Sequence, residues 1–372
     1  MSAVSDIIES VSAVEVEVPL ARPLAIGTAT VVSRHYTIVR IRCGSGIEGV
    51  GYSFSRRLPV AAIVNDMLAP LAIGRDATLT EAVRHALLSA FWPAADHGTF
   101  TTAVSAVDLA LWDAAGKRHG VCVAKLLGQT RNRLPLCIVV GYVYDEGEAT
   151  LRRELEQAIA LGARSVKVVV GAGSPERDAA RVGLARSLIG PDRLLAVDAF
   201  RSFTDLDDAL RRVRAMQPHD LSFVEDPFSE TLAPLVAELR RRTGLSIGLG
   251  ESLAGHRLVR GLIDADAADV IRLDALVIGG VREFMNAAGL ASAYGRPVAT
   301  HVHTETHVQF AAALPNLFAG GIEYMPPAFG LDALHLLLKS SLRIVDGGLA
   351  VPEAPGFGME WDWDAVGRYA RG

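Results

Sequence analysis

Leu194-Leu-Ala-Val-Asp198, Phe223-Val-Glu225-Asp-Pro227 and Ile247-Gly-Leu-Gly-Glu251 repeat one pattern in the middle of the chain. Each begins with a short apolar run that is typical of a buried strand, and each soon reaches a carboxylate. The three carboxylates lie 27 and 26 residues apart. This is about the length of one strand, one helix and two loops. The spacing therefore predicts parallel strands whose carboxyl ends point into one shared bowl.

The same pattern of short apolar runs separated by amphipathic stretches extends over roughly 200 residues. Amphipathic helices are predicted between further apolar runs, which are Leu136–Tyr142, Ser165–Val170, Val270–Leu273, Val298–His301 and Ile322–Tyr324. We expect an α/β fold of about eight strand–helix units, the arrangement of a TIM-type barrel. A doubly wound open sheet is the alternative, and the lack of a Gly-x-Gly-x-x-Gly run at a helix start weakens its dinucleotide-binding form.

The two ends of the chain differ from this middle part. Alternating runs at Val14–Val18 and Tyr36–Arg42, then Gly49–Phe54, predict an antiparallel meander, and residues 102–119 predict a strong helix. We therefore divide the chain into an α+β part over residues 1–125, a barrel over 126–341 and a C-terminal segment over 342–372. The Pro- and Gly-rich C-terminal segment is expected to pack back on the first part.

Composition limits the function classes. The chain has 372 residues, a formal net charge of -5 and 50% hydrophobic residues, without a basic stripe that would suit nucleic acid. Cys43, Cys122 and Cys137 do not have the spacing of a metal site, and their odd number disfavours a disulfide framework. No apolar run is long enough for a membrane span, and the start lacks a signal peptide. We expect a cytoplasmic protein.

Four more polar residues stand at or in the predicted strands, namely Lys167, Asp274, His301 and Glu323. Three carboxylates in one bowl repel one another unless a cation neutralises them, and oxygen-only ligands favour Mg²⁺. The sequence thus predicts Mg²⁺ bound by Asp198, Glu225 and Glu251. Taken singly, each acid is more often a helix cap or a surface charge, so the prediction depends on all three together.

These motifs resemble the enolase superfamily, and the run from Asp274 through Ile278-Gly-Gly280 to His301 and Glu323 resembles its mandelate racemase branch in particular. The resemblance covers nearly the whole chain. It implies a (β/α)₇β barrel with a capping domain built from both chain ends, symmetric oligomers that often have eight subunits, and a small carboxylate substrate. It also implies abstraction of the substrate's α-proton, with the enediolate stabilised by Mg²⁺ and neighbouring cations.

Two positions depart from the family pattern. The second barrel strand of the family usually ends in Lys-x-Lys, whereas this chain has Lys167 followed by Val169, and Val169 cannot accept a proton. Phe200 stands where many members have Asn, which removes a polar group near the site. The resemblance makes His301 the base with Asp274 behind it, places Lys167 on the substrate carboxylate, and makes Glu323 an acid that hydrogen-bonds the carboxylate or the enediolate.

With a base on only one face, β-elimination of water from a hydroxy or sugar acid is favoured over racemisation. A racemase or epimerase remains an alternative, because Tyr142, Tyr52 or Cys137 can supply a second proton donor, and a non-catalytic relative is a third. We expect Tyr52, Arg56, Tyr142 and His303 to contact the substrate, Arg56 from a cap segment at residues 52–58 whose donors suit an anion.

Overall fold

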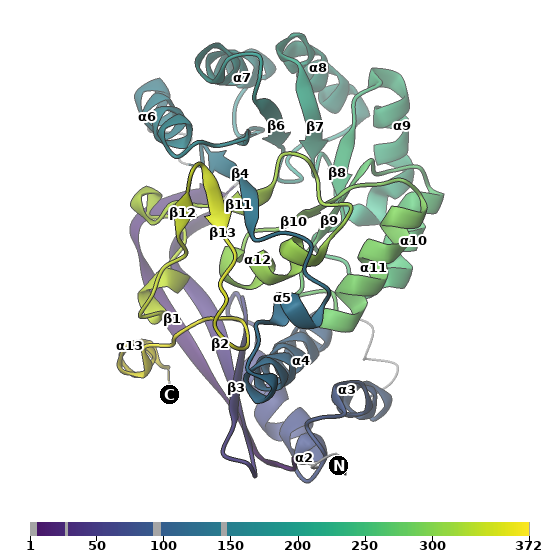
Figure 1. Cartoon of the computed structure of the whole chain (residues 1–372). Helices are drawn as coiled ribbons and strands as arrows, with labels where there is room; N and C mark the ends of the chain where they lie inside the picture. The colour runs from purple at the N-terminus through teal and green to yellow at the C-terminus, as the bar shows by residue number, and fades with distance from the viewer. Residues whose placement is uncertain (1–5, 27–28, 92–97, 143–146, 372) are drawn as a thin grey trace.

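The computed structural model describes residues 6–26, 29–91, 98–142 and 147–371. The N-terminal part is a three-stranded antiparallel sheet, in the order β1-β2-β3, with helices on one side (Figure 1). Its strands are β1 (Ile8–Ile26), β2 (Ala29–Cys43) and β3 (Glu48–Ser53). Its helices are α1 (Val60–Ala62), α2 (Ala69–Ala72), α3 (Thr80–Ser89), α4 (Gly98–His119) and α5 (Val123–Leu126), with a π-helical turn at Ile63–Leu68.

Alternation along β2 explains why this sheet is covered on both faces. Tyr36 and Ile38 belong to the apolar core shared with the barrel, whereas Val39 and Ile41 belong to the core under the N-terminal helices. Successive strand residues point to opposite faces, so one strand serves both cores. Gly49 in β3 lets α4 approach, because a Cβ atom there would lie 2.0 Å from the carbonyl oxygen of Ala110.

In the second part, the described residues form eight parallel strands, each except the last followed by a helix along the chain. The strands are β4 (Arg133–Val140), β5 (Ser165–Val169), β6 (Leu194–Asp198), β7 (Leu221–Glu225), β8 (Ile247–Leu249), β9 (Val270–Leu273), β10 (Val298–Thr300) and β11 (Ile322–Tyr324). The helices are α6 (Gly147–Ala160), α7 (Pro175–Ile189), α8 (Leu206–Met216), α9 (Ala233–Thr243), α10 (His256–Asp264), α11 (Val281–Ala293) and α12 (Thr304–Ala313). Short 3₁₀ turns lie at Gln217–His219, Glu230–Leu232, Pro327–Phe329 and Leu334–Leu337.

Strands β4 to β10 pair with one another in chain order, and β11 pairs with β4. This arrangement confirms the predicted α/β class. Within the described residues no ladder joins β10 to β11, although Val298 of β10 forms a parallel bridge with Leu317, which precedes β11. Closure of the barrel by a complete ladder therefore remains a prediction. None of the described helices is long and apolar enough to cross a membrane.

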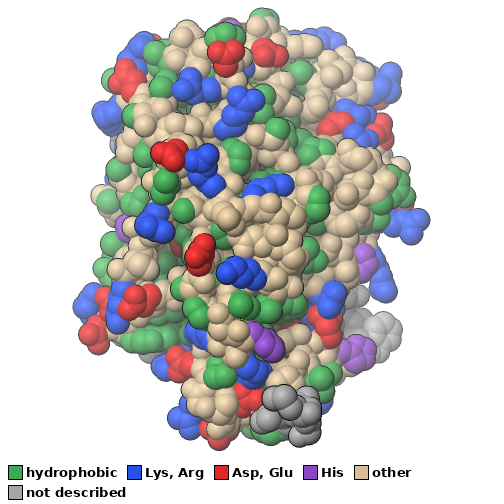
Figure 2. All heavy atoms as spheres, in the orientation of Figure 1, with side chains coloured by type: hydrophobic (Ala, Val, Ile, Leu, Met, Phe, Trp, Pro, Cys, Tyr) green, Lys and Arg blue, Asp and Glu red, His purple; other side chains and the backbone are tan. Residues whose placement is uncertain are grey.

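The C-terminal segment contacts both parts of the fold. Strand β13 (Gly348–Ala350) pairs with β12 (Ile344–Val345) and with the start of β4, and α13 (Trp363–Tyr369) follows. The chain end reaches β1, where the Arg371 amide donates to the carbonyl of Glu15 at 2.9 Å. Figure 1 shows this end beside the N-terminal sheet, and Figure 2 shows acidic and basic side chains interspersed on the same face.

Asp108 links the two parts. It lies in α4, is 1% exposed, and one carboxylate oxygen accepts the Val281 amide at the start of α11 at 2.7 Å. Gly280 has no side chain at this contact, where a Cβ atom would lie 2.2 Å from the carboxylate. Burial, only partly offset by the Val281 hydrogen bond, raises the pKa of Asp108 to about 7.

We predict that Asp108→Ala lowers the free energy of unfolding by about 1–3 kcal/mol, because a buried amide loses its acceptor. Asp108→Asn keeps an oxygen acceptor and should lose less. A raised pKa means that the folded carboxyl retains its proton longer, so its contribution is present at low pH and is lost as pH rises through about 7. Urea unfolding should therefore show that the free energy of unfolding of Asp108→Asn rises relative to that of the wild type between pH 5 and pH 9. A difference that stays constant with pH would contradict this.

Candidate active site

The predicted site residues meet at the carboxyl ends of the parallel strands. Asp198 and Glu225 are the last residues of β6 and β7 and lie in register with each other. Glu251 follows β8 by two residues, and Asp274 and His301 directly follow β9 and β10. Parallel strands in register bring their ends to one edge, which is why a regular spacing in the sequence becomes a cluster in space.

Lys167 is the centre of this cluster. Its side chain projects from β5, is 1% exposed, and its Nζ atom lies 2.6 Å from Glu225 Oε1 and 3.5 Å from Asp198 Oδ2. Nζ also donates to Glu323 Oε1. Burial lowers the pKa of Lys167, but these carboxylates outweigh it and hold the pKa well above its usual value. Lys167 is therefore a fixed cation rather than a base.

Arg272 is a second buried cation that the sequence reasoning missed. It lies in β9, is 1% exposed, and contacts Glu225 Oε2 through Nε at 3.1 Å and Glu323 Oε1 through Nη2 at 2.6 Å. The available signal was its position two residues before Asp274, because alternate strand residues share a face. Arg201 is a third cation. It lies 2.9 Å from Asp226 and 3.0 Å from Glu230, and its distance to Glu251 is longer, 3.7 Å.

The carboxylates fit a hard divalent cation in their chemistry. Burial raises the pKa of Glu225 to about 8, even with Arg272 and Lys167 beside it, and burial also raises the pKa of Asp198. Further positive charge at this point would relieve that cost. As the side chains stand, no group of three or more His, Cys, Asp or Glu among the described residues is arranged to hold a metal ion. Lys167 lies against Asp198 and Glu225, so coordination requires these side chains to rotate.

His301 and Asp274 form the predicted pair. His301 Nδ1 lies 2.9 Å from Asp274 Oδ2, and Asp274 Oδ1 accepts the Leu276 amide at 2.8 Å. Burial lowers the pKa of His301, but Glu251 and Asp274 outweigh it, so this pKa lies above its usual value. Burial raises the pKa of Asp274, yet the hydrogen bond from His301 and the nearby histidines hold it well below normal. The other ring nitrogen of His301 lies 3.5 Å from Glu251 Oε2.

A narrow cavity of about 50 Å³ lies between the cap and this cluster. Its lining consists of Arg34, Tyr36, Phe54, Arg56, Tyr142, Phe200, His301, Val302, His303, Met325 and Asp332. Ligand pockets usually enclose ~300 Å³ or more, so a substrate enters only if these side chains move. Arg34 and Arg56 lie over the Phe54 ring, at 5.4 Å and 5.0 Å from its centroid.

The cavity tests the predicted substrate contacts. Arg56, Tyr142 and His303 line it, and burial lowers the pKa of His303 to about 4, which keeps that ring neutral. Tyr52 does not line it. This tyrosine is 0% exposed and packs edge-on against His303 and Trp361, because the alternation of β3 turns it into the core. Tyr52 therefore lies behind His303 in this structure, and its direct contact with the substrate stays a prediction.

Phe200 forms one wall of the cavity. Its ring meets Tyr142 at 6.2 Å, and its backbone is left-handed, with φ of 53°, a conformation that costs a non-glycine residue energy. The same backbone places its amide 2.9 Å from Asp198 Oδ1. The strained residue thus holds a predicted metal ligand and faces the cavity.

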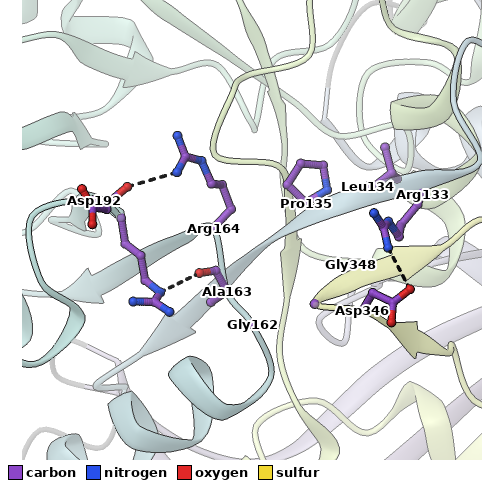
Figure 3. Close-up of a pocket in the computed structure, with 11 residues that line it drawn as sticks. Arg133, Leu134, Pro135, Gly162, Ala163, Arg164, Asp192, Asp346 and Gly348 are labelled. Atoms are coloured by element: carbon purple, nitrogen blue, oxygen red, sulfur yellow. Dashed lines mark hydrogen bonds and ion pairs between the residues drawn. The ribbon is translucent and has the colours of Figure 1, made fainter.

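A separate hollow of about 570 Å³ lies at the opposite ends of the strands (Figure 3). Arg133 begins β4, whereas Arg164 and Arg193 directly precede β5 and β6. These arginines are engaged, since Arg164 donates to the carbonyl of Asp192, Arg193 to that of Ala163, and Arg133 pairs with Asp346. The hollow contains no predicted site residue, and barrel enzymes keep their chemistry at the other end.

The fold and the site define the class, an α/β enzyme whose parallel strands end in carboxylates, buried cations and a His–Asp pair. Residues 8–128 match the family model for the mandelate racemase/muconate lactonizing enzyme N-terminal domain, and residues 150–365 match that for the enolase C-terminal domain-like fold. The chain belongs to the mandelate racemase/muconate lactonizing enzyme family of the enolase superfamily, as the sequence motifs indicated.

Relatives of known activity are similar along most of their length. A 3,6-anhydro-alpha-L-galactonate cycloisomerase from Streptomyces coelicolor is 30% identical over 90% of this chain and 91% of its own. An L-talarate/galactarate dehydratase from Salmonella typhimurium is 28% identical over 87% of this chain and 79% of its own. The structure of an L-talarate dehydratase from Polaromonas sp. JS666, complexed with Mg and L-glucarate, is 29% identical with a TM-score of 0.89 and covers 99% of this chain and 98% of its own.

Asp274→Asn should lower the pKa of His301, because a negative hydrogen-bond partner of the protonated ring is replaced by a neutral one. Titration of the histidine ring signals by NMR measures this directly. Asp346→Asn, at the far end of the strands, is the control and should leave the value unchanged. An unchanged His301 pKa in Asp274→Asn would show that the pair is not electrostatically coupled.

Proposed function

We propose that this protein is a Mg²⁺-dependent dehydratase of a hydroxylated or sugar acid, in which His301 removes the proton next to the carboxylate. The observation that supports this most is the His301–Asp274 pair, with 2.9 Å between Nδ1 and Oδ2, at the strand ends beside Lys167 and the carboxylate cluster. The same step is common to dehydration and to the other activities considered below.

His301 has the arrangement of a general base. When Nδ1–H is donated to Asp274, the other ring nitrogen of the neutral ring carries a lone pair that can accept a proton, and Glu251 Oε2 lies 3.5 Å from it. Asp274 remains an anion, so it stabilises the imidazolium that forms. Burial lowers the pKa of His301, but Glu251 and Asp274 raise it above its usual value, which makes the ring a stronger base.

Asp198, Glu225 and Glu251 are the residues that would hold Mg²⁺. Bound there, the ion would supply positive charge to stabilise the negative charge that develops on the substrate carboxylate. Lys167 adds a fixed ammonium group at the same place, so it can hold the carboxylate but cannot take its α-proton. The occurrence of Mg in structures of similar proteins supports this assignment.

Elimination follows from the single base. His301 takes the α-hydrogen as a proton, the C–H electron pair forms a carbon–carbon double bond, and the bond from the β-carbon to its hydroxyl breaks. The imidazolium returns the proton to the departing hydroxide, which leaves as water. The enol product then becomes a 2-keto-3-deoxy acid. Val169 cannot deliver a proton to the opposite face, which disfavours inversion.

A cycloisomerase is the second candidate function, because a 30% identical relative has that activity. The α-proton step is the same, but the leaving oxygen belongs to a ring and stays in the molecule. The two reactions differ in mass, since dehydration removes one water and ring opening gives an isomer. Mass spectrometry of the product therefore separates them.

We predict that incubation with Mg²⁺ and a panel of aldonic, uronic and aldaric acids yields a 2-keto-3-deoxy product from at least one acid. EDTA should abolish the product, and His301→Asn should slow its formation about 10²–10⁴-fold, the usual contribution of a general base. His219→Asn, in a surface turn, is the matched control and should retain activity. Product formation that survives EDTA would contradict the proposal, as would full activity of His301→Asn.

We also predict that substrate recovered from D₂O keeps its configuration at the α-carbon, because His301 is the proposed base on one face and Val169 stands where the family has a second lysine. NMR and chiral chromatography of the recovered acid measure deuterium content and configuration. Exchange with inversion would instead identify a racemase or epimerase, and Tyr142 would become the first candidate for the second acid–base group, since it lines the cavity.

A further inference from the structure

The barrel interior is built around the side chain of Arg272. Its strand β9 also carries Val270, which packs with Ala196, Phe223 and Ala299 in a compact buried cluster. At Gly248 in β8 a Cβ atom would lie 2.8 Å from the Phe223 ring and 3.7 Å from Arg272 Cδ. These residues leave room for a long cation inside the barrel, where a charge is costly unless it is paired.

Arg272 is paired across the interior with two strands. From β9, its Nε reaches Glu225 at the end of β7 at 3.1 Å, and its Nη2 reaches Glu323 on β11 at 2.6 Å. All three side chains are 1–2% exposed. The guanidinium therefore fixes the relative positions of a proposed metal ligand and of Glu323.

Glu323 is fully engaged by this arrangement. Its Oε1 accepts from both Lys167 and Arg272, and its Oε2 accepts the Val302 amide at 2.7 Å. Val302 directly follows His301 and has a left-handed backbone, with φ of 30°. Glu323 thus anchors Lys167 and the turn after His301, and its role as an acid stays a prediction.

The charges of the interior give Arg272 a role beyond packing. Asp198, Glu225 and Glu323 contact the two cations Lys167 and Arg272, and Glu251 is a fourth carboxylate that lies within the electrostatic influence of both. One divalent ion would neutralise this set, whereas without Arg272 it would keep a negative charge beside an anionic substrate. Arg201 lies closer to Asp226 and Glu230 and does not change this balance.

We propose that Arg272 is a positioning residue of the active site, which holds Glu323 as an anchor for Lys167 and supplies the positive charge that lets a carboxylate ligand bind beside the divalent ion. The inference rests on the proposed function, since it assumes a bound divalent ion and an anionic ligand. Arg272 is expected to weaken the binding of the divalent ion and to strengthen the binding of the carboxylate ligand. A purely structural role would not produce these opposite effects.

Calorimetric titration of the full chain with Mg²⁺, and of the Mg²⁺-saturated protein with oxalate, tests this. Oxalate is the probe because it is a planar carboxylate anion. In Arg272→Met, Mg²⁺ should bind at least as tightly as in the wild type and oxalate about tenfold or more weakly, since one favourable charge is lost. Arg272→Lys keeps the charge and should hold both affinities within about threefold.

Combining Val169→Lys with Arg272→Met removes the positive charge at residue 272 and adds one at residue 169. Val169 lies two residues after Lys167 and in register with Asp198, so a lysine there faces the same cluster. The double variant should regain oxalate affinity about fivefold or more over Arg272→Met. Circular dichroism would show whether Arg272→Met alone folds. If it does not, the double variant and Arg272→Lys still test the proposal.

Parallel loss of Mg²⁺ and oxalate affinity, without recovery in the double variant, would overturn the inference and leave Arg272 a structural residue. Unchanged oxalate affinity in Arg272→Met would overturn it as well. A wild-type protein that binds no Mg²⁺ is a different failure, because it overturns the proposed function itself. The binding measurements thus separate the two claims.

Discussion

The interior of the barrel holds carboxylates from Asp198, Glu225 and Glu323 against the buried cations Lys167 and Arg272, while Glu251 lies beside His301. Charges this deep are tolerated only when each has partners, so the surrounding strands are constrained to supply them. The register of β6 with β7 brings the acids together, and Gly248 leaves room for the arginine. These carboxylates hold the pKa of Lys167 well above its usual value, which is why we propose His301 rather than Lys167 as the base.

The cap and the barrel share this site. Phe54 and Arg56 reach over it from the N-terminal sheet, while Tyr142 and Phe200 enclose it from the barrel loops. Their mutual position depends on buried contacts far from the chemistry. Asp108 caps α11, and Asp113 accepts amides from Val50 of β3 and Phe357 of the C-terminal segment. The fold therefore places a mostly aromatic wall and two guanidinium groups opposite the strand ends.

The sequence predicted the strands from β6 to β11 well, because a short apolar run followed by a polar residue has few other interpretations when it recurs every 22–27 residues. It did not predict the length of β1, which runs from Ile8 to Ile26 although Pro19 and Pro23 interrupt the alternation. The pairing with β2 shifts register between Pro19 and Leu24, which accommodates them. Arg272 was missed because one charged residue in an apolar strand belongs to no motif, and only the packing shows what it reaches.

The roles of Glu323 and Tyr52 show a second limit. Sequence places a residue on a strand, but the number of donors around a carboxylate and the face that a tyrosine takes depend on neighbouring strands. Metal ligation has the same dependence, since Lys167 now contacts two of the proposed ligands. A crystal structure with Mg²⁺ and oxalate tests the account most directly. We predict the ion on Asp198, Glu225 and Glu251, with Lys167 moved onto the oxalate and Arg272 still on Glu323. An ion bound elsewhere, or Lys167 still between Asp198 and Glu225, would contradict it.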